Sequence, residues 1–184
     1  MKAVILLSGG LDSMACVNFY QSIGYETCAI FCDYGQPAAQ QERKASKYIA
    51  EYFKIPYKVI EIRNIIIPQE GEIFGRNAML AIAALFCTGS GPYKIIIGIH
   101  AGTNYADCTS TFVEAINRVF DVYSNGTVIL ETPFVNWKKG DIVLYCKKND
   151  LPYKYTYSCE AGEYPPCGKC MSCLDREAFF KDGL

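Results

Sequence analysis

The chain has 184 residues, of which 51% are hydrophobic, and its 18 Lys and Arg residues nearly balance 19 Asp and Glu residues. This size and apolar content suit one ordinary folded domain and exclude a disordered tail. The net charge of −1 argues against a strongly basic nucleic-acid-binding protein, although a local basic patch stays compatible with it.

Strand and helix patterns alternate along most of the chain. In chain order, we expect a strand at 3–7, a helix at 11–23, a strand at 26–32, a helix at 36–54, a strand at 57–62, an irregular segment at 65–73, an apolar and therefore buried helix at 77–87, a strand at 94–99, a helix at 111–123, a strand at 127–130 and a helix at 138–147. This alternation predicts an α/β fold with a doubly wound parallel sheet, covered by helices on both faces.

The composition changes near Leu151, where Tyr, Cys, Gly and Pro become frequent and the helical pattern stops until Leu174. We therefore expect a nucleotide-binding domain at 1–150 and a small cysteine-rich segment at 151–184. Ligands of doubly wound sheets bind beyond the carboxyl ends of the strands. The loops to search are 8–13, 32–37, 62–76, 98–111 and 131–139.

The sequence predicts a cytoplasmic protein without membrane contact. The first apolar run is too short for a signal peptide, since Ser8 interrupts it. No run approaches the roughly 18–20 apolar residues that cross a bilayer. In a reducing compartment, the ten cysteines are more often metal ligands or redox groups than disulfides.

A glycine-containing turn follows the first strand and opens the first helix; we call it the glycine loop, and it consists of Ser8, Gly9, Gly10, Leu11, Asp12 and Ser13. Glycines let the backbone approach an anion, and the free N–H groups at a helix start point toward it. Two serine hydroxyls add donors, whereas Asp12 either caps the helix or helps to bind a cation. The alternative is a plain strand-to-helix turn with an N-cap residue.

Four cysteines of the C-terminal segment have the spacing C-x7-C-x2-C-x2-C: Cys159, Cys167, Cys170 and Cys173. Such spacing can place four thiolates in a tetrahedron around Zn²⁺, which would then be structural because no open coordination position remains. An iron–sulfur cluster and a redox dithiol are the competing interpretations. The cysteines in strand and helix patterns are interpreted as small buried hydrophobic residues: Cys16, Cys28, Cys32, Cys87 and Cys146.

The glycine loop resembles the SGGxDS pyrophosphate loop of the N-type ATP pyrophosphatases, which activate a carboxylate or carbonyl oxygen by adenylation. Together with the four cysteines, further strings resemble the 7-cyano-7-deazaguanine synthase family. They are the strings at 31–36 (FCDYGQ), 75–77 (GRN), 105–108 (YADC), 112–115 (FVEA) and 156–159 (TYSC), Thr132-Pro133 with Trp137 and Lys139, and the string at 173–176 (CLDR).

The resemblance implies an ATP-dependent ligase that uses Mg²⁺ and structural zinc. The carboxylate of 7-carboxy-7-deazaguanine is adenylated, ammonia gives an amide, and a second ATP dehydrates the amide to a nitrile. The implied ATP-binding residues are the glycine loop with Asp33, Tyr34 and Gln36. The implied substrate-binding residues are Arg76, Asn77, His100, Tyr105, Asp107 and Cys108, and the implied catalytic residues are Asp12, Ser13, Arg76 and Lys139.

Several of these residues have simpler interpretations that the sequence leaves open. Arg76 can form a salt bridge at a helix start, and Lys139 can be a solvated surface lysine. Asp107 can be the N-cap of the following helix. Cys108 is either a packed thiol or a nucleophile, and His100 is either a structural histidine or a ligand contact.

The chain departs from the family pattern where the base should bind. The segment before Gly75 is short, and Phe74 replaces the proline expected there. Near Asp107, Ala106 and Thr109 replace a proline and an arginine, and the loop at 98–105 is tight and lacks an acidic residue. We therefore formulate a second hypothesis, in which a protein amine replaces ammonia and the deazaguanine is joined to a protein, as in antiphage defence.

Three functions from other classes compete with these hypotheses. A tRNA-modifying sulfurtransferase would need a basic extension, and the balanced charge argues against it. A nucleotide-binding subunit without turnover and a purely structural zinc-stabilised protein are the other two. The family resemblance also implies a homodimer, and the partners expected are a small deazaguanine, with no nucleic acid and no membrane.

Overall fold

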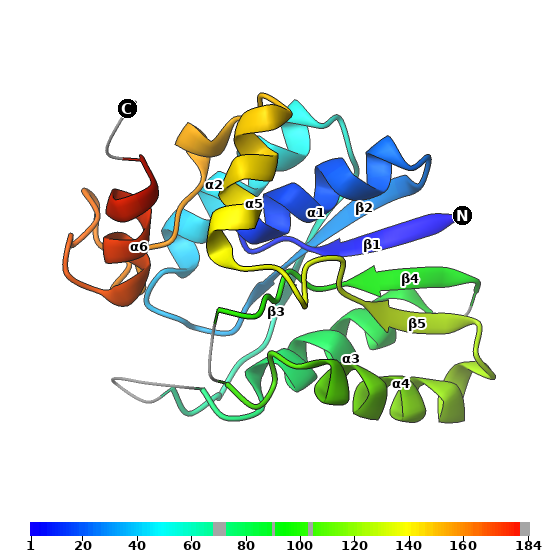
Figure 1. Ribbon diagram of the computed structural model, residues 1–184. Coiled ribbons are helices and arrows are strands. Elements are labelled where there is room, and N and C mark those ends of the chain that lie inside the picture. The colour runs from blue at the N-terminus through cyan, green and yellow to red at the C-terminus, as the bar shows by residue number, and fades with distance from the viewer. Residues whose placement is uncertain (68–72, 90, 103–104, 181–184) are drawn as a thin grey trace.

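The computed structural model describes residues 1–67, 73–89, 91–102 and 105–180. Five strands form one parallel sheet in the order β3-β2-β1-β4-β5, as Figure 1 shows. Their bounds are β1 Lys2–Leu6, β2 Glu26–Asp33, β3 Tyr57–Glu61, β4 Tyr93–Ile96 and β5 Val128–Glu131. The strand order reverses beside β1, so the predicted doubly wound sheet is confirmed.

Helices cover both faces of this sheet (Figure 1). One face carries α1 Leu11–Ser22, α2 Ala39–Tyr52 and α5 Lys139–Lys148, and the other carries α3 Arg76–Thr88 and α4 Ser110–Ser124. The short helix η1 Tyr153–Tyr155 and the last helix α6 Met171–Phe180 follow α5. No helix in the described ranges has both the length and the apolar run that a membrane crossing requires.

The central strand β1 supplies both hydrophobic cores. Ala3 and Ile5 belong to the core beneath α1 and α5, whereas Val4 and Leu6 belong to the core beneath α3 and α4. Side chains alternate between the two faces of a strand, and both faces are covered here. This burial explains why the run is apolar without interruption.

Several expectations differ from the structure, and the strand expected at 94–99, for example, ends at Ile96. The helix expected at 36–54 extends only from Ala39 to Tyr52, and Pro37 disfavours a helical conformation for Gln36 before it. Helix α6 begins at Met171, before the expected resumption of helical pattern at Leu174. Helix α3 is not fully buried as its composition predicts, since the side chains of Ile82 and Phe86 are exposed.

Two predicted loops lie partly outside the described residues. These are residues 68–72 of the irregular segment expected at 65–73 and residues 103–104 of the loop at 98–105. The described part of the C-terminal segment packs on the rest of the chain, because Leu151, Tyr153 and Phe180 join the core beneath α1 and α5.

Candidate functional site

The glycine loop connects the central strand to α1 at the carboxyl edge of the sheet. Gly9 has a φ of +86°, which glycine adopts without strain. A Cβ on Gly9 would lie 2.6 Å from the carbonyl oxygen of Glu42, so α2 packs directly against the loop. The Ser13 hydroxyl donates to the Gly10 carbonyl at 3.0 Å and lies 3.2 Å from the Ser8 hydroxyl.

The first turn of α1 is suited to an anion. No side chain in the described ranges caps its N-terminus, so Asp12 is not the helix cap that one interpretation expected. The uncapped N–H groups and the positive end of the helix dipole face the loop.

Asp12 instead forms an ion pair with Lys139, the first residue of α5. The Lys139 Nζ atom lies 2.7 Å from each carboxylate oxygen of Asp12, although the two residues are 127 positions apart. Both side chains are mostly buried, so the interpretation of Lys139 as a solvated surface lysine is wrong. The pair brings a cation and a carboxylate beside the glycine loop, where phosphate groups and their metal ion require such charges.

The loop after β2 is held by the side chain of Gln36. Its amide oxygen accepts from the Tyr34 backbone N–H at 2.9 Å, and its amide nitrogen donates to the Cys32 carbonyl and to Glu42 Oε2. Asp33 turns elsewhere, because its carboxylate accepts from the backbone N–H of Gly35. Tyr34 and Gln36 line the same pocket as the glycine loop, whereas Asp33 does not.

Across from the glycine loop, the start of α3 meets the loop before α4. The Asn77 backbone N–H donates to Asp107 Oδ2 at 3.1 Å, and the Asn77 side chain donates to the Asp107 carbonyl at 3.1 Å. Thr109, not Asp107, caps α4, since its hydroxyl accepts from the Phe112 N–H. The interpretation of Asp107 as the cap of the following helix is therefore wrong, and the carboxylate lies at the N-terminus of α3.

Arg76 is the first residue of α3 and is placed by its neighbours. Its Nε atom donates to Asn77 Oδ1 at 3.2 Å. Burial raises the pKa of the Tyr34 hydroxyl, and the Arg76 guanidinium beside it opposes this shift. The positive charge of Arg76 therefore lies between Tyr34, in the loop after β2, and the hydrogen-bonded pair of Asn77 and Asp107. The described residues contain no salt bridge to Arg76, contrary to the simpler interpretation of this residue.

His100 follows the end of β4. Its Nδ1 atom accepts from the Gly102 N–H at 3.0 Å, which leaves the proton of the neutral ring on Nε2. Burial lowers the pKa of His100, with Asp12 opposing the shift and Lys139 supporting it. The ring thus has a structural hydrogen bond and also lies close to the ion pair.

One pocket of about 680 Å³ collects these groups at the carboxyl edge of the sheet, within the size range of small-molecule sites. Of the residues predicted to bind ATP or substrate, all line this pocket except Gly9 and Asp33. The lining members are Ser8, Gly10, Leu11, Asp12, Ser13, Tyr34, Gln36, Arg76, Asn77, His100, Tyr105, Asp107, Cys108 and Lys139. The pocket thus joins an end at the glycine loop that is suited to an anion to a polar end at Arg76 and Asp107.

Glu42 also lines the pocket and was missed in the sequence analysis. Burial raises the pKa of its carboxyl group, while the Gln36 hydrogen bond and the Arg76 charge oppose this shift. A signal was present, because Glu42 lies on the helix face that Ala45 and Ile49 bury. A carboxylate on an apolar stripe is unusual and marks a functional candidate.

The C-terminal segment forms one wall of the same pocket. The Tyr157 backbone N–H donates to the Gly9 carbonyl at 2.9 Å, which ties the segment to the glycine loop. Arg176 on α6 donates to the Thr156 hydroxyl at 2.8 Å and to the Tyr153 carbonyl at 3.1 Å. Ser158, Glu160, Asp175 and Arg176 join the lining, and none of them was predicted.

The four C-terminal cysteines converge, as their spacing predicts. Their Sγ atoms all lie within 4.8 Å of one another. A tetrahedral Zn²⁺ with Zn–S bonds of about 2.3 Å would separate its sulfurs by about 3.8 Å, so small shifts would fit the set to a metal. Burial opposes ionisation of Cys159, but N–H donors such as that of Cys167 lower its pKa to about 6. The residues therefore fit a thiolate-bound metal.

Gly162 fastens this cysteine cluster to the main domain. Its φ is +72°, and a Cβ there would lie 2.1 Å from the carbonyl oxygen of Pro37. The backbone of the cluster thus touches the loop after β2 at a point where only glycine fits. A metal held by the four cysteines would consequently stabilise a wall of the pocket at a distance from the reacting groups.

Solved structures share the fold. A predicted subunit of a tRNA methyltransferase from Methanocaldococcus jannaschii superposes with a TM-score of 0.53 at 14% identity, covering 85% of this chain and 92% of that one. A U34-tRNA thiolase NcsA from Methanococcus maripaludis, solved with its [4Fe-4S] cluster, gives a TM-score of 0.53 at 14% identity and covers 98% and 69%. Identities this low show a common fold and nothing finer.

Curated sequences are much more similar. A 7-cyano-7-deazaguanine synthase from Caldicellulosiruptor saccharolyticus is 31% identical over 215 aligned positions, covering 100% of this chain and 93% of the relative. The enzyme of the same name from Oceanobacillus iheyensis is 32% identical and covers 98% and 94%. Both alignments are longer than the chain itself, so the relatives contain residues that this chain lacks.

The family model described as queuosine biosynthesis protein QueC matches in two parts, residues 2–72 and 66–183. The parts meet in the segment before α3, where the sequence analysis found a shortened loop. The match covers nearly the whole chain, and the convergence of its motifs in one pocket agrees with it. The chain is therefore a member of the QueC family of queuosine biosynthesis proteins.

Proposed function

We propose that the chain is an ATP-dependent carbon–nitrogen ligase that adenylates the carboxylate of 7-carboxy-7-deazaguanine for attack by a nitrogen nucleophile. The names of its relatives support this choice of substrate. The observation that carries the proposal is the single pocket that joins the glycine loop and Lys139 to Arg76 and Asp107. One end suits a triphosphate, and the other suits a polar base with a carboxylate.

In the first step, a carboxylate oxygen of the base attacks the α-phosphorus of ATP. The bond from the α-phosphorus to the bridging oxygen breaks, and pyrophosphate leaves with the bonding electrons. The N–H groups of the glycine loop and the Lys139 ammonium stabilise the charge that develops on the leaving group. Asp12 would hold Mg²⁺ beside the phosphates, where the ion would offset their negative charge.

In the second step, the nitrogen nucleophile attacks the acyl carbon, and AMP leaves with the bonding electrons. The nitrogen loses one proton on forming the amide. Glu42 takes up this proton, in agreement with its raised pKa and its place in the pocket wall. When ammonia is the nucleophile, a second ATP adenylates the amide oxygen, and loss of AMP and a proton leaves the nitrile.

The polar end of the pocket orients the base. Arg76 neutralises the substrate carboxylate before adenylation, since its guanidinium lies at the pocket wall. Asp107 uses Oδ2 for the start of α3, while Oδ1 lies 3.8 Å from the Cys108 thiol. Oδ1 accepts from the guanine-like N–H edge of the base. Asn77, Tyr105 and His100 complete the enclosure.

Zinc is the metal that the cysteine cluster would hold, in a structural role. Four thiolates with mutually close sulfurs are typical of structural zinc. The thiolase with the same fold holds an iron–sulfur cluster, so iron is the alternative to exclude. Elemental analysis of purified protein decides between them: one zinc per chain supports the proposal, whereas iron with visible absorbance contradicts it.

Incubation with ATP, 7-carboxy-7-deazaguanine and ammonium, followed by mass spectrometry, tests the activity. We expect AMP, pyrophosphate and the amide or nitrile of the base. A folded, metal-loaded protein that forms none of these with ammonium or with an amine would contradict the proposal. Omission of the base is the control, because adenylation requires its carboxylate.

A second candidate nucleophile is a protein amine, which would give a deazaguanine–protein conjugate. The observations in its favour are the short segment before α3 and the residues beside Asp107 that depart from the family pattern, with Tyr105 partly exposed at the rim. A shorter rim admits a larger nucleophile than ammonia. Antiphage systems are the setting in which such a conjugate would serve. Efficient formation of free nitrile from ammonium would contradict this candidate.

A further inference from the structure

The sheet ends on two edge strands, β3 and β5, whose outer edges differ. Along a strand, the backbone N–H and C=O groups of successive residues point to opposite sides. Every second residue of an edge strand therefore points its backbone groups away from the sheet. Such groups bind the strand of another chain unless the protein covers them.

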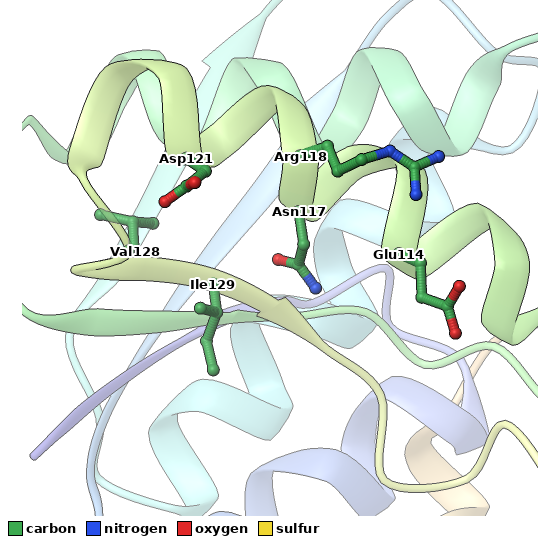
Figure 2. Close-up of a pocket in the computed structure, with 7 residues that line it drawn as sticks. Glu114, Asn117, Arg118, Asp121, Val128 and Ile129 are labelled. Atoms are coloured by element: carbon green, nitrogen blue, oxygen red, sulfur yellow. The ribbon is translucent and has the colours of Figure 1, made fainter.

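The side chain of Asn117 on α4 covers the outer edge of β5. The Ile97 N–H donates to the Glu131 carbonyl at 3.2 Å, so Glu131 faces β4 and its neighbour Leu130 faces outward. The Leu130 N–H donates to the Asn117 side chain at 2.7 Å, and the Leu130 carbonyl accepts from it at 2.9 Å. Figure 2 shows this side chain pointing from α4 to β5.

Ser124, the last residue of α4, repeats this arrangement two residues earlier on β5. Its hydroxyl oxygen accepts from the Val128 N–H at 3.2 Å and lies 3.4 Å from the Val128 carbonyl oxygen, to which it donates. Val128 and Leu130 are the outward-facing residues of β5. Helix α4 therefore closes this edge to any further strand.

The outer edge of β3 has no such cover within the described part of the chain. The Ile62 N–H donates to the Asp33 carbonyl at 2.8 Å, so the even-numbered residues here face β2. The outward-facing residues are Tyr57, Val59 and Glu61. No described residue forms a hydrogen bond with their backbone N–H or C=O groups. This edge is open where the edge of β5 is closed.

Positive charge surrounds the open edge. Lys54 precedes β3, Lys58 lies on it and Arg63 follows it, and all three side chains are exposed. Glu61 is offset by two cations, since its carboxylate lies 2.6 Å from the Arg63 guanidinium and 3.8 Å from that of Arg43. These residues carry four positive charges and one negative charge, although the whole chain has a net charge of −1.

We propose that the outer edge of β3 binds an extended, acidic segment of a partner protein, which joins the sheet as a further strand. The backbone of this segment exchanges hydrogen bonds with Tyr57, Val59 and Glu61, as in other cases of strand addition. Its acidic side chains pair with Lys58 and the neighbouring cations, whereas a basic segment is repelled. Charge therefore selects the occupant that the open backbone groups admit.

A strand bound to β3 lies beside the pocket. Strand β3 is parallel to β2 and β1, so its carboxyl end is at the edge of the sheet that carries the glycine loop. Ile67, in the segment after β3, lines the pocket. This place suits a protein that delivers an amine, but the inference does not rest on the proposed function, since it uses no reacting group.

Fluorescence anisotropy of a labelled peptide, in which Glu and Val alternate over seven residues, tests the proposal with the full chain. We expect saturable binding, and binding at least about tenfold weaker when Lys replaces Glu in the peptide. Lys58→Glu should weaken binding of the acidic peptide by a similar factor. Lys148→Glu is the matched control, since Lys148 is an exposed lysine of α5, and it should bind as wild type.

Val59→Pro tests the backbone contacts. Proline has no N–H group and is tolerated on an edge strand where that group faces outward. Binding of the acidic peptide should weaken at least about tenfold. Val59→Thr keeps the N–H group and a β-branched side chain, so it should bind as wild type. No binding to wild type, equal binding of the Lys peptide, or equal binding by the two Val59 variants would overturn the proposal.

If circular dichroism shows that Val59→Pro does not fold, amide hydrogen exchange of the wild type decides. In the free chain, the Val59 and Glu61 N–H groups should exchange faster than those of Lys58 and Ile60, which face β2. The acidic peptide should slow the exchange of Val59 and Glu61. Peptide-induced protection elsewhere would overturn the proposal. Protection that needs only a high protein concentration would make a second copy the occupant and would overturn it as well.

Discussion

The glycine loop and the Arg76–Asp107 cluster face each other across one pocket, but different kinds of contact hold them. The glycine loop is fixed mainly by backbone: Gly9 touches the α2 backbone, and its carbonyl accepts from Tyr157. The opposite cluster depends on side chains, chiefly those of Asn77 at the start of α3 and Asp107 in the loop before α4.

In the proposed reaction, the glycine loop serves the chemistry, and the Arg76–Asp107 cluster serves the choice of substrate. Backbone contacts tolerate few changes, so the end of the pocket at the glycine loop, where we propose that ATP activates a carboxylate and which we call the phosphate end, is fixed by the fold itself. Side chains on loops are exchanged without rebuilding the sheet. We therefore expect the polar end at Arg76 and Asp107 to determine the choice of base or nucleophile in the proposed reaction, and variants should affect the two ends separately.

Loss of the metal should impair both ends of the pocket, because the C-terminal segment forms one of its walls and is hydrogen-bonded to the glycine loop. Cys170→Ser is expected to lose the bound metal and nearly all activity, since structural zinc contributes about 10–16 kcal/mol in small zinc modules. Elemental analysis and the rate of pyrophosphate release measure these effects. Cys28→Ser, another half-buried cysteine outside the cluster, is the control and should retain both. Full activity of a metal-free Cys170→Ser variant would contradict this role.

Lys139→Ala should impair only the step that takes place at the glycine loop, the release of pyrophosphate. We expect pyrophosphate release to slow by about 10²–10³-fold, as when one donor to a developing charge is removed. Lys138 is the adjacent, exposed lysine, so Lys138→Ala serves as the control. An equal loss in both variants would show that Lys139 acts only through general charge.

Gly9→Ala tests whether backbone packing sets the phosphate end. Gly24 has nearly the same φ, +83°, but its Cβ would meet no atom within 4 Å. Gly24→Ala therefore reports the backbone strain alone, about 1–2 kcal/mol. Gly9→Ala should cost about 1–3 kcal/mol more through overpacking against α2. Urea unfolding measures both, and equal losses would mean that the close contact with α2 does not matter.

Asp107→Asn tests the polar end of the pocket separately from the end at the glycine loop. We expect it to have the smallest effect of these variants. The amide keeps the shape, and its oxygen can still accept from Asn77, but the charged acceptor for the base is lost. We expect KM for the deazaguanine to rise about tenfold and KM for ATP to stay unchanged. Asp121→Asn, at an exposed position of α4, is the control. A rise in the KM for ATP, without a rise in the KM for the deazaguanine, would place Asp107 at the end that binds ATP and would contradict the prediction.

The parts predicted well from sequence are those that local pattern determines. The alternation of apolar runs and helices predicted the sheet and its two covered faces, and the position of the glycine loop follows from them. The cysteine spacing likewise predicted the cluster, because its four ligands come from a short stretch of chain.

Contacts between distant segments were not predictable in this way. The Asp12–Lys139 pair joins two helices across 127 positions, and Asp107 lies at the start of α3 instead of capping its own helix. Apolar composition showed that α3 needs cover but not what provides it. Glu42 was overlooked because a helix face was interpreted by its apolar members alone.

Transfer of an oxygen isotope tests the central claim, adenylation of the carboxylate at the glycine loop, most directly. The protein is given ATP, ammonium and 7-carboxy-7-deazaguanine with ¹⁸O in its carboxylate, and the AMP is analysed by mass spectrometry. Attack by the carboxylate on the α-phosphorus predicts one ¹⁸O atom in AMP for each amide formed. Product formation with unlabelled AMP, or with ¹⁸O in inorganic phosphate and ADP as the second product, would contradict the account.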